Sequence, residues 1–113
     1  MFDKLPYKVN LVEVGPRDGL QNESKVVSTK EKIQYIEKLM LAGLKSIEVT
    51  SFVKTEKIPQ MNDGEEVFRA LLSNPNFKKT ALSCLVPNLK GMNRAIEAKV
   101  SEVAVFTATS ETF

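Results

Sequence analysis

Short apolar runs alternate along this chain with polar segments in which apolar residues recur at helical spacing. Runs rich in β-branched residues predict strands, because such side chains pack well on a half-buried sheet. Four runs qualify: YKVNLVEV at 7–14, KSIEVT at 45–50, KTALSCLV at 79–86 and EVAVFT at 102–107. In the segments between them, apolar residues lie three and four positions apart, which predicts a helix in each.

Polar residues and glycines predict where these helices begin and end. Ser28 to Glu31 has the S-x-x-E form of a capping box, so the first helix should begin there and end at Gly43. Asn62 to Glu65 predicts a second helix start, with acids in its first turn, and Asn74-Pro75 its end. The apolar stripes are Ile33, Ile36, Leu39 and Met40, then Val67, Phe68, Leu71 and Leu72, then Leu89, Met92, Ala95 and Ile96.

The predicted order of elements is therefore β-α-β-α-β-α-β, which implies parallel strands joined by right-handed crossovers. A doubly wound sheet and part of a (β/α)8 barrel both fit this order. The loop after the first strand, GPRDGLQN, matches neither the dinucleotide-binding nor the P-loop pattern, so both architectures stay open. The 113 residues are enough for one domain, and no interdomain linker is evident.

Composition narrows the class of protein. With 42% hydrophobic and 27% charged residues, the chain is typical of a soluble globular protein, and no apolar run approaches the ~20 residues of a membrane span. A net charge of +2 with scattered lysines argues against a nucleic-acid surface. The opening MFDKLPYK resembles neither a signal nor a transit peptide, and the one cysteine, Cys84, fits a reducing compartment. We therefore expect a cytoplasmic protein that contacts neither membrane nor nucleic acid.

The absence of histidine narrows the chemistry further. Within this chain there is no imidazole base, no histidine metal ligand and no Ser-His-Asp triad. A metal bound by these residues would use oxygen ligands, which favour Mg²⁺, Mn²⁺ or Ca²⁺ over zinc.

Candidate chemical groups lie where the predicted strands end. In both architectures, functional residues occupy the C-terminal ends of the parallel strands and the loops that follow. Arg17 and Asp18 follow the first predicted strand, and Glu13 lies near its end. Simple alternation on the second strand places Ser46, Glu48 and Thr50 on one face. In a barrel, one face is the interior, so Glu48 would meet the active site, and Glu13 on the first predicted strand is in a similar position.

Each of these residues also has an ordinary structural interpretation. Arg17 and Asp18 could form a solvated turn pair, and Glu48 could face water on an edge strand. Cys84 is best interpreted as a small buried apolar side chain. Taken singly, none of these positions establishes an active site.

Together, several segments resemble one family. VEVGPRDGLQNE at 12–23 resembles the opening of the 3-hydroxy-3-methylglutaryl-CoA (HMG-CoA) lyase family, and IEVTSFV, IPQMND, LVPNLKG and FTATSETF resemble its later segments in the same order. The resemblance runs from about residue 8 to the last residue. Relatives that make isopropylmalate or homocitrate typically have R-D-G-E-Q, whereas Leu20 occupies that acid's position here, which favours the lyase.

The resemblance implies a fold and a reaction. It implies that residues 1–113 are the incomplete N-terminal half of a (β/α)8 TIM-barrel domain, with three βα units and a fourth strand. The implied reaction is a metal-assisted retro-Claisen cleavage of the acyl-CoA substrate HMG-CoA to acetyl-CoA and acetoacetate, in leucine catabolism and ketone-body formation. It also implies a homo-oligomer for the full-length parent.

The resemblance further implies roles for particular residues. Asp18 matches a ligand to a catalytic Mg²⁺ or Mn²⁺, and Arg17 matches an arginine that contacts the substrate and stabilises the thioester enolate. Glu48 matches a catalytic carboxylate. Gln21, in the same loop as Arg17 and Asp18, is expected to bind the substrate. Gly15 and Gly19 would let the backbone turn tightly and bring Arg17 and Asp18 over the barrel mouth.

The same comparison shows what this chain lacks. The family's remaining metal ligands, two histidines and an asparagine, and its glycine-rich loop with a mobile cysteine have no counterparts here. We therefore expect the isolated chain to be inactive. Two alternatives stay open: a non-enzymatic half-barrel that associates with itself or with a complementary half, and a related enzyme that acts in the condensing direction.

Overall fold

The computed structural model describes residues 2–111, which contain a three-stranded parallel sheet. The strands β1 (Ser46–Ser51), β2 (Ala81–Leu85) and β3 (Glu102–Ala104) lie in the order β1-β2-β3. These are the second, third and fourth predicted strands, each with slightly different bounds. Short helical turns occur at Phe2–Lys4, Gly15–Gly19, Pro59–Met61 and Pro75–Phe77.

The three predicted helices are confirmed as α1 (Thr29–Leu41), α2 (Gly64–Leu72) and α3 (Leu89–Glu97). Ser28 caps α1 as predicted, since its hydroxyl oxygen accepts the Glu31 N–H at 3.2 Å. Gly43, just past α1, has a φ of +100°, the left-handed conformation expected where glycine ends a helix.

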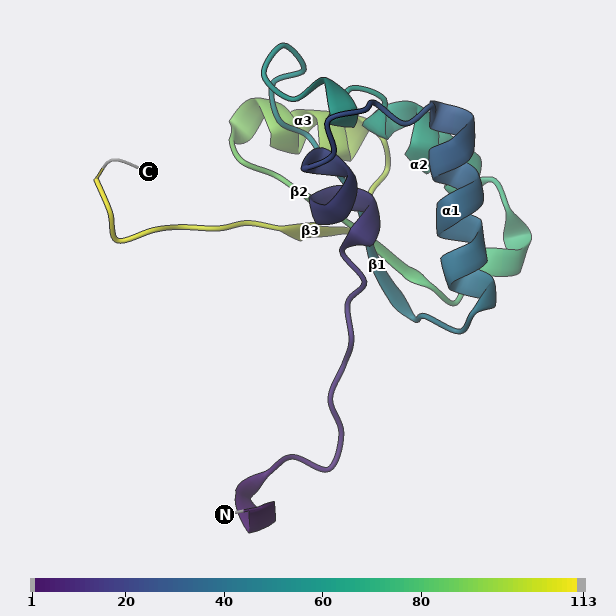
Figure 1. Ribbon diagram of the computed structural model, residues 1–113, viewed down its shortest axis with the longest axis vertical. Coiled ribbons are helices and arrows are strands. Elements are labelled where there is room, and N and C mark those ends of the chain that lie inside the picture. Colours follow the sequence, from purple (N-terminus) through teal and green to yellow (C-terminus); the bar gives the residue numbers. More distant parts are fainter. Residues whose placement is uncertain (1, 112–113) are drawn as a thin grey trace.

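All three helices pack on one face of the sheet. Their buried side chains Ile36, Met40, Val67, Phe68, Leu71 and Ala95 form one cluster with Ile47, Val49, Leu82 and Cys84 from the strands. A doubly wound sheet carries helices on both faces, whereas a barrel carries them only outside. Sequential strands with their helices on one face are therefore the pattern of a (β/α)8 barrel segment, and Figure 1 shows this outer layer of helices.

The apolar stripes of the helices are only partly buried. Leu72 at the end of α2 is 51% exposed, and Leu89 and Ile96 of α3 are 77% and 62% exposed. Among residues 2–111, no helix is both long enough and apolar enough to cross a membrane.

The predicted strand at 7–14 is the main error of the sequence analysis. Only Glu13 pairs, donating its N–H to the Ser46 carbonyl and accepting the Glu48 N–H, both at 2.9 Å. The preceding residues extend away from the body, with Val9 68% and Leu11 71% exposed (Figure 1). Because β1 begins at Ser46, residues before Glu13 have no strand residue opposite them, and β-branched composition alone does not provide a partner.

Candidate active site

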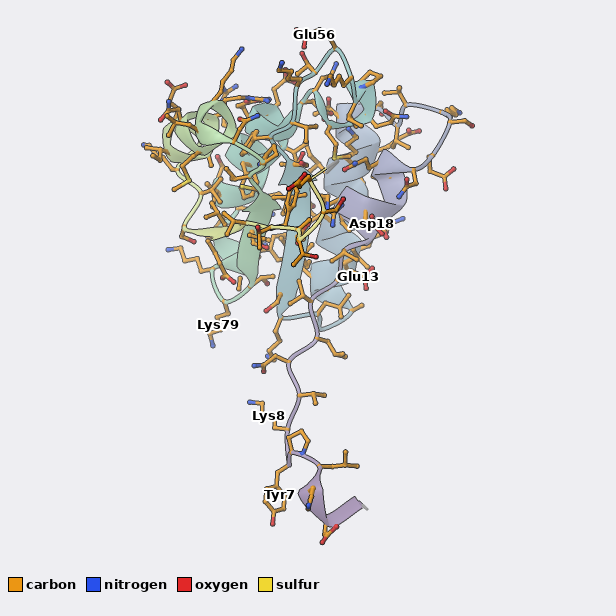
Figure 2. The ribbon with its side chains drawn as sticks, turned by 90° about the vertical axis from the view of Figure 1, so that its left-hand side faces the viewer. Tyr7, Lys8, Glu13, Asp18, Glu56 and Lys79 are labelled. Atoms are coloured by element: carbon orange, nitrogen blue, oxygen red, sulfur yellow. The ribbon has the colours of Figure 1, made fainter. Side chains whose placement is uncertain are left out.

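The turn that carries Arg17 and Asp18 is a single turn of π-helix, Gly15–Gly19, directly after the Glu13 bridge. The Val14 carbonyl accepts N–H groups from Arg17, Asp18 and Gly19 at 3.1, 2.7 and 3.3 Å. One-turn π-helices are rare and occur frequently at functional sites. Figure 2 shows Asp18 beside the sheet, whereas Tyr7 and Lys8 lie far out on the N-terminal segment.

Arg17 and Glu48 form an ion pair across 31 positions of sequence. Arg17 Nε donates to Glu48 Oε1 at 2.5 Å, and the two side chains are 19% and 10% exposed. Arg17 Nη1 also lies 3.3 Å from Asp18 Oδ1, on a carboxylate that is 56% exposed. The structure therefore brings Arg17, Asp18 and Glu48 together as expected, and it buries Glu48 rather than leaving it in water.

The residues that follow the turn supply further polar groups. Asn22 Nδ2 donates to the Asp18 carbonyl at 2.8 Å, which fastens the end of the turn. Gln21 Oε1 is buried and has no hydrogen-bond partner among the described residues. Buried amide oxygens are normally paired, so this atom is free to accept a hydrogen bond from a ligand or water.

Glu13 does not join this group of residues. Its Oε1 accepts the Gly15 N–H at 3.1 Å, and its carboxylate lies close to the Tyr35 hydroxyl of α1. Burial raises the pKa of the Tyr35 phenol, and the nearby Glu13 charge raises it further. Glu13 therefore faces the helix side of the sheet, and the expectation that it lies in a position similar to that of Glu48 is wrong.

The two glycines of the turn serve different purposes from those expected. Among residues 2–111, Gly43 is the only glycine with a positive φ, so neither Gly15 nor Gly19 is needed for a left-handed turn. A Cβ on Gly15 would lie 2.3 Å from the Tyr35 hydroxyl oxygen, whereas one on Gly19 would meet nothing within 4 Å. A side chain at Gly15 would therefore force Tyr35 and Glu13 to shift, and no comparable close approach is found at Gly19.

An irregularity in β1 changes which residues share the face of Glu48. The register pairs Glu48 with Ser83, Thr50 with Cys84 and Ser51 with Leu85, with a bulge between Glu48 and Thr50. Paired residues share a face, and Ser83 and Leu85 alternate onto the same face of β2, so Ser51 accompanies Glu48 and Thr50 does not.

The predicted position of Thr50 on the Glu48 face is therefore wrong. Its hydroxyl lies 3.6 Å from the Met61 sulfur, on the helix side. Ser51, which strand alternation did not single out, is fully buried, and its hydroxyl oxygen has no partner among the described residues. Alternation could not reveal it, because the bulge is visible only in the pairing with β2.

Cys84 is a buried apolar group, as expected. It has no exposed surface and belongs to the core cluster. Burial raises the pKa of its thiol to about 12, and the charge of Glu48 adds to the effect. A thiol in this state is a poor nucleophile, which removes Cys84 from the candidate catalytic groups.

A second polar feature lies where β1 and β2 end. A cavity of about 230 Å³ is lined by residues that include Phe52, Lys54, Asn88, Lys90 and Arg94. The Arg94 guanidinium lies 4.8 Å from the Phe52 ring centre and donates to Glu65 at 2.6 Å and to the Val53 carbonyl at 3.0 Å. Arg94 therefore holds the segment after β1 against α2 and α3.

One candidate metal ligand is present, but not a complete set. Among residues 2–111, no three His, Cys, Asp or Glu side chains lie close enough to hold a metal ion. Asp18 nevertheless fits one position of such a site, because its carboxylate is exposed beside Arg17 and, within the described part of the chain, is engaged only through Oδ1.

The family follows from comparison with known proteins. A model of the HMGL-like family matches residues 8–113, nearly the whole chain. The chain belongs to the HMGL-like family.

Curated HMGL-like relatives are lyases. This chain is 50% identical over 109 residues to 3-hydroxy-3-isohexenylglutaryl-CoA/hydroxy-methylglutaryl-CoA lyase of Pseudomonas aeruginosa, covering 96% of this chain and 35% of that enzyme. It is 49% identical to the mitochondrial hydroxymethylglutaryl-CoA lyase of Homo sapiens, covering 96% of this chain and 33% of that enzyme. The chain thus spans about a third of the length of these relatives. A further relative, from Rattus norvegicus, is named as a cytoplasmic 3-hydroxy-3-methylglutaryl-CoA lyase.

Solved structures of HMGL-like proteins agree with the fold. The Pseudomonas aeruginosa lyase superposes with a TM-score of 0.85 at 50% identity, covering 96% of this chain and 35% of that one. An HMG-CoA lyase from Acinetobacter baumannii, solved with coenzyme A and 3-methylmalate, gives 0.82 at 42% identity over 91% of this chain and 33% of that one. The resemblance inferred from the motifs is confirmed.

Proposed function

We propose that residues 1–113 are the N-terminal part of a (β/α)8-barrel lyase that cleaves HMG-CoA to acetyl-CoA and acetoacetate. The observation that carries the proposal is the Arg17–Glu48 ion pair at 2.5 Å, with Asp18 beside it, in an HMGL-like chain. The cited relatives are lyases, and the chain covers about a third of each. The activity is therefore assigned to the whole barrel and not to this chain alone.

The proposed reaction breaks the C2–C3 bond of the substrate. The C3 hydroxyl proton passes to a base, C3 becomes the ketone of acetoacetate, and the bonding electrons form a thioester enolate. Protonation of the enolate at C2 then gives acetyl-CoA. Negative charge develops on the thioester oxygen during cleavage, so a fixed cationic donor at that oxygen lowers the barrier.

Arg17 is the group in this chain that fits the role of enolate stabiliser. Its guanidinium is always charged and donates several hydrogen bonds in one plane. With Nε held by Glu48 and Nη1 close to Asp18, no hydrogen bond from Nη2 is seen among residues 2–111. A donor of this kind, without a protein partner, is available to the substrate oxygen.

Asp18 fits as one ligand of a divalent metal. Mg²⁺ and Mn²⁺ prefer about six oxygen ligands, and Asp18 offers an exposed carboxylate at the same edge as Arg17. Such a metal would supply positive charge for the hydroxyl and carboxylate oxygens of the substrate. Gln21, with its unpartnered amide oxygen, is the proposed further substrate contact from this loop.

The same proposal also covers the substrate class, the metabolic role and the oligomeric state of the whole enzyme. The substrate is an acyl-CoA, in keeping with the relative solved with coenzyme A. A lyase of this specificity acts in leucine breakdown and ketone-body formation, and we expect the whole enzyme to be a homo-oligomer.

A chimera tests the proposed function. This chain would replace the aligned third of the Pseudomonas aeruginosa lyase, and acetyl-CoA release from HMG-CoA would be measured with Mg²⁺ or Mn²⁺. We expect turnover by the chimera and none by the isolated 113-residue chain. Turnover by the isolated chain would disprove its dependence on the rest of the barrel, and an inactive but folded chimera would disprove the function. Condensation of a keto acid without cleavage would favour the condensing alternative.

A self-associating half-barrel is the second candidate. Exposed apolar side chains on both terminal segments favour it, including Val9, Leu11, Val105 and Phe106. Unpaired strand edges also promote association. The size of the chain in solution tests this candidate: a stable dimer with a cooperative unfolding transition supports it, and a folded monomer contradicts it.

A further inference from the structure

Glu48 is anchored by strand pairing, whereas its ion-pair partner lies outside the sheet. Its backbone N–H donates to the Glu13 carbonyl at 2.9 Å, and Glu48 pairs with Ser83 of β2, so β1 is held on both sides at this position. Arg17 lies instead on a five-residue turn. The strand therefore provides a fixed acceptor for the long Arg17 side chain.

The contact between them also sets the orientation of the guanidinium. Glu48 Oε1 takes Nε, the nitrogen nearest the Arg17 backbone, at 2.5 Å. In a planar guanidinium held at Nε, the directions of both terminal nitrogens are fixed: Nη2 donates from the same edge as the Nε–H, and Nη1 lies on the other edge. The Glu48 side chain is 10% exposed, and the more exposed Asp18 carboxylate is near Nη1.

We propose that Glu48 is a positioning residue that acts through Arg17, rather than a group that exchanges protons with the substrate. This inference rests on the proposed lyase function and refines the catalytic role first expected for Glu48. A carboxylate that is only 10% exposed and already accepts the Arg17 Nε–H is engaged as a holder of the guanidinium. Its contribution is to restrict the rotation of the long Arg17 side chain before substrate arrives, so that less ordering is needed during reaction.

A double-mutant cycle in the active chimera tests this role. We expect Arg17→Met to lower kcat by about 10²–10³-fold and Glu48→Ala by about 10–100-fold, as for outer groups that orient a functional residue. Glu48→Gln keeps an acceptor oxygen and should lose less than Glu48→Ala. In the Arg17→Met background, Glu48→Ala should cause almost no further loss. Losses that multiply would show that Glu48 acts independently and would overturn the proposal.

Chemical rescue separates positioning from a merely structural role. Added guanidinium should restore part of the activity of Arg17→Ala, because Glu48 still provides its binding contact, and should fail to restore Arg17→Ala/Glu48→Ala. Equal rescue of both variants would contradict the proposal. Glu65→Gln is the matched control. Glu65 forms its ion pair, at 2.6 Å, with Arg94 and not with Arg17, so this substitution should leave kcat unchanged.

A measurement on the isolated chain tests the positioning role of Glu48 without requiring lyase activity. The Nε–H proton of Arg17, observed by nitrogen-15 NMR, should exchange slowly with solvent in the wild-type chain and rapidly in Glu48→Ala. An exchange rate that does not respond to this substitution would overturn the inference even if the chimera is inactive. An inactive chimera with a responsive Nε–H would instead refute only the proposed function.

Discussion

Two ion pairs with buried carboxylates each join residues 31 positions apart, but they are built differently. Lys32 of α1 meets Asp63 at 2.7 Å on the helix side of the sheet, with side chains 5% and 10% exposed. Lys32 Nζ also donates to the Gln60 carbonyl, and the Thr29 hydroxyl donates to the second Asp63 oxygen at 2.6 Å. Every oxygen of this carboxylate is therefore occupied.

The Arg17–Glu48 pair is open by comparison. Only one Glu48 oxygen has a hydrogen-bond partner among residues 2–111, and one terminal nitrogen of Arg17 has none. Arg17 is 19% exposed and lies at the end of the sheet where a barrel active site is expected. A closed network stabilises a fold, whereas an open one keeps binding capacity for a ligand.

The largest effect is expected from breaking the closed pair. Asp63→Ala leaves the Lys32 ammonium buried without its counter-ion, so the free energy of unfolding should fall by about 3–5 kcal/mol. Urea denaturation followed by circular dichroism measures this loss. As a control, Lys32→Met/Asp63→Leu removes both charges and should cost less than Asp63→Ala. A single variant as stable as wild type would show that the network is not structural.

Breaking the open pair should affect function more than stability. Arg17→Met in the chimera should lose about 2.7–4 kcal/mol of transition-state stabilisation, through lost donation to the enolate oxygen. In the isolated chain it should cost only about 1–2 kcal/mol in the free energy of unfolding, because water reaches Glu48 once Arg17 is removed. Steady-state kinetics of the chimera test the expected loss of activity, and urea denaturation of the isolated chain tests the expected loss of stability. A stability loss equal to that of Asp63→Ala would erase the distinction between the pairs.

A substitution in the turn that carries Arg17 should have a smaller effect on stability. Gly15→Ala places a Cβ 2.3 Å from the Tyr35 hydroxyl oxygen, so local repacking should cost about 1–3 kcal/mol in the free energy of unfolding. Adding Tyr35→Phe removes the nearest atom and should recover part of this loss. Gly19→Ala is the matched control, because nothing lies within 4 Å of its Cβ. Equal thermal denaturation of the two alanine variants would argue against this packing requirement.

The smallest effect concerns the pH dependence of stability. The pKa of Cys84 is about 12 in the folded chain and near 9.0 in the unfolded one, so the folded state retains the proton longer. Its contribution is complete below pH 9 and is lost as pH rises from about 9 to about 12. Urea denaturation at pH 8 and pH 10 should show this decline, and Cys84→Ala should reduce it.

Glu48→Gln sharpens that measurement. Because the Glu48 charge is the lesser cause of the raised Cys84 pKa, this substitution should lower the thiol pKa modestly. A thiol titration compares the two proteins. No change would indicate that the open pair is electrostatically isolated from the core behind it.

The local features of this fold were predictable from the sequence. Ser28 begins α1 and Gly43 follows its end, because capping and chain reversal depend on groups only a few residues apart. The motif around Arg17 and Asp18 identified the candidate site and its family, since its residue types and spacing are specific. Those expectations needed no knowledge of distant contacts.

Tertiary structure decided everything that depends on a partner far along the chain. The β-branched run at 7–14 forms only the Glu13 bridge, because a strand needs a neighbouring backbone. The bulge in β1 places Ser51 rather than Thr50 on the face of Glu48, because register is set by pairing with β2. Glu48 itself became a partner of Arg17 only when folding closed 31 residues of sequence, so the role of each carboxylate is a property of long-range packing.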